Sequence, residues 1–121
     1  MLPKKFVSAL FAIGTAAFLT THTEDANAAT FVCNGGIDYV DIVAVSSTNT
    51  RLQVGCFENG VLKHVVAHLQ ESNSAYNRNI ETLKLWASQV QAAILSGRQM
   101  NLYHDVVGGN NVLTAISLRR Q

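Results

Sequence analysis

Short runs of alternating hydrophobic and polar residues follow one another along most of the chain, with polar or glycine-rich turns between them. Alternation with a period of two is typical of half-buried strands, and several of these runs are rich in β-branched residues. Asn59-Gly60 stands between two of the runs and favours a tight hairpin, because both residues tolerate positive φ. Gly108 and Gly109 begin a second permissive turn. The pattern predicts five strands, at residues 37–46, 51–57, 62–69, 99–107 and 112–118.

The hydrophobic pattern changes to steps of three and four residues between positions 79 and 96, which predicts one helix. Asn77 is the expected N-cap, and Gly97 is placed to end the helix. The helix would be about 27 Å long at 1.5 Å per residue. The stripe expected to face the core of its own domain consists of Ile80, Leu83, Ala87, Val90 and Ile94.

Two segments carry more hydrophobic surface than a small monomer requires. The strand 37–46 has apolar residues on both faces, which predicts that it lies between a core and a second buried surface. The helix has a second apolar stripe beside the one that faces the core. We expect this second stripe to form a subunit interface through Leu85, Trp86 and Leu95.

The elements occur in the order three strands, one helix and two strands, with short connections. This order is typical of an α+β domain that is mostly β. A closed barrel manages open sheet edges better than a flat sheet of five strands does. We therefore predict a single domain with a small five-stranded barrel of the oligonucleotide/oligosaccharide-binding (OB) type, in which one long helix lies between strands three and four.

The N-terminal region has the organisation of a secretory signal peptide. Lys4 and Lys5 precede an uncharged apolar run at residues 6–19, and a polar stretch then ends in Ala26-Asn27-Ala28. The apolar run is shorter than the roughly 20 residues that a membrane-spanning helix needs, so we expect no membrane span. The sequence predicts a signal peptide at residues 1–28, cleaved after Ala28 or alternatively after Ala29, and one secreted domain at residues 29–121.

Composition narrows the class of protein further. The chain is 48% hydrophobic and only 14% charged, which excludes a disordered tail. Nine Lys and Arg residues against eight Asp and Glu residues give a net charge of +1, so nothing favours a nucleic-acid partner. In an oxidising compartment the only two cysteines, Cys33 and Cys56, most simply form a disulfide. A redox or metal-binding pair would need closer spacing or further ligands.

No group of residues has the spacing of a catalytic or metal site. His64 and His68 share one face of a predicted strand but lie roughly 13 Å apart there, too far to bind one ion together. Asp38 and Asp41 fall on opposite faces of their strand, so they form no acid and base pair. We therefore expect no catalytic residues, no metal and no cofactor.

A binding surface remains as the candidate site. The loop before the helix and the end of the penultimate strand lie near one another in a barrel of this topology. Their amides, carboxylates and aromatic rings suit a sugar, which needs hydrogen bonds to its hydroxyls and an apolar platform for its C–H face. The alternative is that these loops are polar simply because water surrounds them. The candidate glycan-binding residues are Gln70, Glu71, Asn73, Tyr76, Tyr103, His104, Asp105 and Asn110.

Three segments carry a resemblance to a known family: the hairpin VGCFENG at 54–60, the helix exit AAILSGRQMNLYH at 92–104 and the last strand NVLTAISL at 111–118. They resemble the B subunits of the bacterial A-plus-five-B toxins, the group that includes the cholera, heat-labile, pertussis, subtilase and typhoid toxins. In the subtilase and typhoid branch a tyrosine just after the helix exit contacts sugar, and the matching residue here is His104.

The resemblance implies a virulence factor that is secreted through the periplasm and forms a homopentameric ring. The long helices would line a central pore, a catalytic toxin A subunit would dock on one side, and glycans of host glycoproteins or gangliosides would bind on the other. A second hypothesis is a monomeric periplasmic barrel that binds or inhibits another protein, such as a lysozyme inhibitor or an immunity protein. That hypothesis requires Leu85, Trp86 and Leu95 to be buried within one chain or matched to a different partner.

Overall fold

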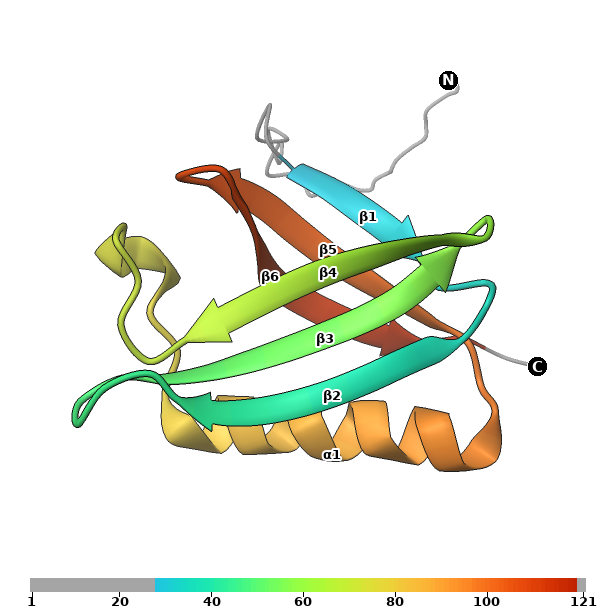
Figure 1. Ribbon diagram of the computed structural model, residues 1–121, viewed down its shortest axis with the longest axis horizontal. Coiled ribbons are helices and arrows are strands. Elements are labelled where there is room, and N and C mark those ends of the chain that lie inside the picture. The colour runs from blue at the N-terminus through green and yellow to red at the C-terminus, as the bar shows by residue number, and fades with distance from the viewer. Residues whose placement is uncertain (1–27, 120–121) are drawn as a thin grey trace, which may run out of the picture.

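The computed structural model describes residues 28–119, and the proposed signal peptide lies outside the described residues except for Ala28 (Figure 1). The described part is mostly β, with one α-helix, as the sequence predicts. It has six strands rather than five. The elements are β1 (Ala28–Val32), β2 (Ile37–Ala44), β3 (Thr50–Glu58), β4 (Val61–His68), the short helix η2 (Ser74–Tyr76), α1 (Ile80–Ser96), β5 (Met100–Val107) and β6 (Asn110–Leu118).

The six strands form one sheet in the order β1-β5-β6-β4-β3-β2. Neighbouring strands are antiparallel except β4 and β6, which run parallel and meet at Val66 and Val112. In Figure 1, β2, β3 and β4 lie side by side in front of β5 and β6, and α1 runs along β2. The edge strands β1 and β2 each have one neighbour within the described sheet.

The additional strand β1 pairs along its whole length with β5, from Ala28 opposite Asp105 to Val32 opposite Asn101. This strand cannot be predicted from the hydrophobic pattern, because five residues are too few to establish an alternation. Its partner is also distant in the sequence, so no local turn signal marks the pairing.

Turns and caps form where the sequence places glycine and asparagine. Asn59 and Gly60 have φ values of 51° and 81° and join β3 to β4 in the predicted hairpin. Gly97 adopts the left-handed conformation that ends α1. The N-cap is Asn79 rather than the expected Asn77, because the Asn79 side chain accepts a hydrogen bond from the Thr82 amide at 2.8 Å.

The core lies between the sheet and α1. Leu83, Val90 and Ala93 from the helix are buried against residues of β3, β4, β5 and β6. Trp86 and Ala87 are partly buried and pack against the same core. The buried hydrophobic residues outside the helix are Cys33, Leu52, Val54, Cys56, Val65, Ala67, Met100, Leu102, Val112 and Leu113.

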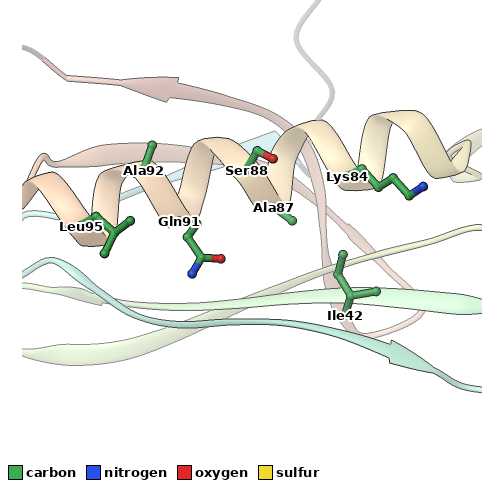
Figure 2. Close-up of a pocket in the computed structure, with 7 residues that line it drawn as sticks. All are labelled: Ile42, Lys84, Ala87, Ser88, Gln91, Ala92 and Leu95. Atoms are coloured by element: carbon green, nitrogen blue, oxygen red, sulfur yellow. The ribbon is translucent and has the colours of Figure 1, made fainter.

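An open groove lies between α1 and β2, and hydrophobic side chains are exposed along it (Figure 2). Ile42 is 47% exposed and Leu95 is 81% exposed, so neither is covered within one chain. The strand β2 is therefore not buried on both faces within the single chain, and the second buried surface that the sequence predicts stays a prediction. The groove encloses about 560 Å³ and is lined by Ile42, Lys84, Ala87, Ser88, Gln91, Ala92 and Leu95.

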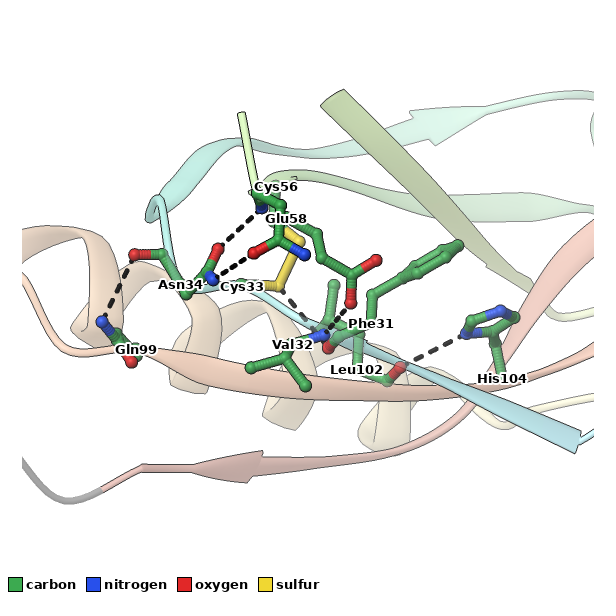
Figure 3. The surroundings of a disulfide bond; sticks show 10 residues. Phe31, Val32, Cys33, Asn34, Cys56, Glu58, Gln99, Leu102 and His104 are labelled. Atoms are coloured by element: carbon green, nitrogen blue, oxygen red, sulfur yellow. Dashed lines mark hydrogen bonds between the residues drawn. A yellow bond between two sulfur atoms is a disulfide. The ribbon is translucent and has the colours of Figure 1, made fainter. Parts of the chain in front are cut away.

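The predicted disulfide is present and joins the segment between β1 and β2 to β3 (Figure 3). The Cα atoms of Cys33 and Cys56 are 5.5 Å apart, and both residues are completely buried. Next to the bridge, the Asn34 amide group donates to Asn59 Oδ1 at 2.8 Å, and the Asn59 backbone amide donates back to Asn34 Oδ1 at 2.8 Å. The Glu58 carboxylate accepts from the Val32 amide at 2.8 Å. These contacts fix the end of β1 against the β3–β4 hairpin.

The described residues contain no helix that is long and apolar enough to cross a membrane.

Candidate functional site

The loop before α1 meets β5 through one side-chain hydrogen bond. The short helix η2 presents Tyr76, whose hydroxyl donates to Asp105 Oδ2 at 2.7 Å. The same loop also reaches the β5–β6 turn, because a Cβ atom added at Gly108 would lie 3.7 Å from Ser72 Oγ. The structure thus brings together the two segments from which the candidate sugar-binding residues come.

Hydrogen bonds to neighbouring elements hold the loop in place. The Glu71 carboxylate is only 5% exposed and lies 2.5 Å from His68 Nδ1, while the Glu71 backbone amide donates to Asn77 Oδ1 at 2.6 Å. The Gln70 amide donates to Asn49 Oδ1 at 2.9 Å, and the Gln70 carbonyl accepts from the Asn49 side chain at 3.0 Å. Glu71 therefore positions the loop instead of presenting its carboxylate to solvent.

The remaining polar candidates on this loop and turn are exposed. Asn73 is the N-cap of η2, and its Oδ1 accepts from the Ala75 amide at 3.1 Å. Asn110 begins β6, opposite Val107 on β5, and is exposed in the turn. Gln70 is exposed as well. These side chains lie on the two segments that the Tyr76–Asp105 contact joins, and their amide groups can donate and accept hydrogen bonds.

Arg78 adds a positive charge that the sequence analysis does not single out. Its guanidinium carbon lies 5.9 Å from the centroid of the Tyr76 ring and 5.8 Å from that of Trp86, within the range of cation–π contacts. In the sequence this arginine precedes a helix and is typical of a solvated charge. Only the folded loop places the cation near both rings.

Trp86, which the sequence analysis expects at a subunit interface, packs partly within its own chain. It is partly buried, packs against the core and contributes one of the rings near Arg78. By contrast, Leu85 and Leu95 are 57% and 81% exposed. The monomer hypothesis can no longer explain these two leucines by burial within one chain, and it needs a different partner to cover them.

His104 does not belong to a surface site, and this corrects its assignment as a glycan-binding residue. It is only 3% exposed, its ring lies against the Phe31 ring with centroids 4.0 Å apart, and its Nδ1 is 3.3 Å from the Leu102 carbonyl oxygen (Figure 3). Alternate residues of a strand point to opposite faces, so Leu102 and His104 point inward while Tyr103 and Asp105 point outward. Strand β1 then covers the buried histidine by contributing Phe31.

Tyr103 is exposed on the outer face of β5, two residues before Asp105 and roughly 7 Å from it along the strand. Hydrogen bonds with the Asn101 and Ser117 side chains hold the pKa of Tyr103 below its ordinary value of 10.0. The outer face of β5 therefore carries the Tyr103 phenol and, two residues later, the Asp105 carboxylate that Tyr76 contacts.

The site has no features of a metal centre. Among residues 28–119, no group of three or more His, Cys, Asp or Glu side chains is arranged to hold a metal ion. His64 and His68 are on β4, and the structure pairs them with different partners, Tyr39 and Glu71.

Comparisons with known proteins add no relative to this description: no family model, no curated protein and no solved structure matches the chain.

Proposed function

We propose that this protein is a secreted, non-catalytic binding subunit that recognises glycans with the surface around Tyr76 and Asp105. The observation that carries the proposal is the 2.7 Å hydrogen bond between these two residues, which unites the loop before α1 with the outer face of β5. The bond brings an aromatic ring and a carboxylate together, and exposed amides lie on the same loop and the neighbouring turn. This combination matches the chemistry of a sugar, whose hydroxyl groups need dense hydrogen bonding and whose C–H face needs an apolar ring.

Each residue has a distinct part in this proposal. Tyr76 supplies the ring, and Asp105 accepts hydrogen bonds from sugar hydroxyls through its carboxylate. The amides of Gln70, Asn73 and Asn110 bind further hydroxyls around the rim. Glu71 and His68 act indirectly, because their contact holds the loop that carries Tyr76.

We also propose that copies of the chain assemble into a ring, which the family resemblance implies is a pentamer. The groove between α1 and β2 supports this assembly, because Ile42 and Leu95 are exposed there and lose contact with water if a second copy covers them. The edge strands β1 and β2 each present an unpaired edge within the described sheet. Head-to-tail contacts between two different surfaces form a ring when the rotation from one copy to the next closes.

An OB-type barrel accounts for the strand order. If β1 and β2 are the two halves of one strand bent at residues 33–36, the order becomes that of a five-stranded barrel with β4 and β6 parallel. The proposed ring of these subunits would carry a catalytic toxin A subunit and deliver it to cells whose glycans the ring binds.

The test is a glycan array probed with the purified secreted protein and two variants, Tyr76→Phe and Asp105→Asn. Tyr76→Phe keeps the ring but breaks the hydrogen bond that joins the loop to β5, and Asp105→Asn removes the charge that accepts from sugar hydroxyls. Each variant should weaken binding about tenfold, as expected for the loss of a hydrogen bond to a charged group. Glu81→Gln, which neutralises an exposed carboxylate on α1, is the matched control and should bind like the wild type. Absence of glycan binding by the wild type, or unchanged binding by both variants, overturns the proposed site.

Native mass spectrometry tests the assembly separately. The wild type should be a ring oligomer, and Leu95→Asp should shift it to smaller species because a charge in the covered groove is costly to desolvate. Glu81→Gln again serves as the control. A wild-type monomer at micromolar concentration would exclude the assembly.

A further inference from the structure

Tyr39, Gly55 and His64 form a row across three strands on the outer face of the sheet. Tyr39 on β2 is opposite Gly55 on β3, and Gly55 is in turn opposite His64 on β4. Residues opposite one another in a sheet share a face, so the two aromatic side chains approach each other over the glycine.

The Tyr39 ring lies directly against the backbone of Gly55. A Cβ atom added at Gly55 would be 2.2 Å from Tyr39 Cε1 and 2.7 Å from Cδ1, so only glycine accommodates the ring there. Glycine inside a strand weakens it and often marks a close approach of this kind. The ring therefore occupies a fixed position, lying across β3 toward β4.

Two hydrogen bonds fix the end of the ring. The Tyr39 hydroxyl is 2.6 Å from His64 Nδ1 and accepts from Gln53 Nε2 at 2.9 Å. Burial, the largest cause, together with the nearby carboxylates of Asp41 and Asp38, raises the pKa of Tyr39 above 10.0 despite the hydrogen bond from Gln53. The hydroxyl is thus protonated at neutral pH and shares a hydrogen bond with His64 Nδ1.

Polar groups border this ring on its solvent side. Asp41 follows Tyr39 by two residues on the same face of β2 and lies opposite Gln53. Asp41 and His64 are exposed. The side chain of Asn111 on β6 donates to the His64 carbonyl at 3.3 Å and closes the far end of the row. A positioned aromatic ring is thus surrounded by a carboxylate, an amide and an imidazole.

We propose that this cluster, the Tyr39 platform, is a second carbohydrate subsite that stacks the C–H face of an uncharged pyranose on the Tyr39 ring. The inference rests on the proposed glycan-binding function and adds a site on a different face of the molecule. Asp41 and Gln53 bind hydroxyl groups of the sugar, and His64 uses Nε2 because Nδ1 is already occupied by Tyr39. Asp41 and Asp38 each act on the Tyr39 hydroxyl more strongly than Arg51 does, so the local field is negative and disfavours an acidic sugar. The ligand class is therefore neutral.

The probes are methyl galactoside and methyl glucoside as neutral sugars and sialyllactose as an acidic one. Ligand-detected NMR titrations of the purified secreted protein give the affinities. Tyr39→Leu removes the platform and should weaken neutral-sugar binding about tenfold. Tyr39→Phe keeps the ring and loses only its hydroxyl, so it should bind more tightly than Tyr39→Leu. If Tyr39→Leu does not fold, Asp41→Ala and His64→Ala, both at exposed positions, provide the same test and should each weaken binding.

The outcomes separate this subsite from the Tyr76 surface. Neutral-sugar binding that is lost in Tyr39→Leu and retained in Tyr76→Phe supports the platform. Binding that survives Tyr39→Leu, Asp41→Ala and His64→Ala but is lost in Tyr76→Phe overturns the platform and leaves the proposed function intact. Absence of binding to any of the three sugars and to the glycan array overturns both.

Discussion

Replacing both Cys33 and Cys56 with alanine should lower the free energy of unfolding by a large part of the total stability of this domain. The bridge joins residues 23 positions apart, and closing a loop of that length contributes about 3 kcal/mol through the entropy of the unfolded chain. Both cysteines are completely buried, so the alanines leave a void that adds roughly 1 kcal/mol to the loss. The expected decrease is therefore about 4 kcal/mol, against the 5 to roughly 15 kcal/mol that is typical of small domains.

Urea unfolding followed by circular dichroism measures this difference in the wild type and the double variant. In a domain of this size, 1 kcal/mol corresponds to a shift of roughly 4–8 °C in melting temperature, so the double variant should melt about 15 °C or more below the wild type. Wild-type protein reduced in denaturant and refolded with reductant is the matched control, since it loses the bridge but keeps both sulfur atoms. A loss below about 1 kcal/mol in both samples would refute the loop-entropy argument.

Three further substitutions test the backbone conformation at a helix end and the ionisation of two tyrosines. Gly97→Ala should destabilise the protein by about 1 kcal/mol in urea unfolding, because the residue has φ of 69° and no neighbour within 4 Å that a methyl group could contact; an unchanged midpoint would contradict this. In a spectrophotometric titration, Tyr103→Phe should remove the absorbance change of a tyrosine that ionises below pH 10.0. Tyr39→Phe should remove the absorbance change of a tyrosine that ionises above pH 10.0. The raised pKa of Tyr39 contributes stability that is present below pH 10.0 and lost as the pH rises through the folded-state pKa, so Tyr39→Phe should flatten the alkaline decline in stability.

Features that depend on neighbouring residues could be predicted from the sequence. The hairpin at Asn59-Gly60 and the helix end at Gly97 each depend on one residue's tolerance of positive φ, and both form as expected. The disulfide is predicted by elimination, because the chain has only two cysteines. The N-cap shifts by two residues because Asn77 instead accepts the hydrogen bond from Glu71 across the loop.

Features that depend on distant pairing could not be predicted. Strand β1 forms by pairing with the edge of β5, with Thr30 opposite Tyr103. The two strands are about 70 residues apart in the sequence, so no local pattern marks the pairing. The same pairing changes the chemistry of the candidate site, since Phe31 covers His104 and removes it from the surface. Strand alternation predicts that His104 and Asp105 face opposite sides, but it does not indicate which of the two sides is buried.

The candidate surface was predicted in outline, because the loop at 69–79 and the end of β5 do meet, through Tyr76 and Asp105. The Tyr39 platform was missed, although one signal was present in the sequence. Gly55 interrupts an otherwise regular strand, and a glycine at such a position indicates that another group approaches the backbone closely. Which group approaches depends on the register between β2 and β3, which the sequence does not specify.

The two segments with excess hydrophobic surface, which the sequence shows as separate features, contribute to one surface in the folded chain. Ile42 comes from the two-faced strand and Leu95 from the second stripe of the helix, and both line the groove between β2 and α1. Val40, two residues before Ile42 on the same face, packs against the core, so the groove continues the core to the outside of the domain. A partner that covers this groove would therefore bury Ile42 from the strand and Leu95 from the helix at once. For this reason the Leu95→Asp substitution is a sufficient test of the assembly. A substitution at Trp86 would also disturb the core, so its effects on assembly and on folding could not be separated.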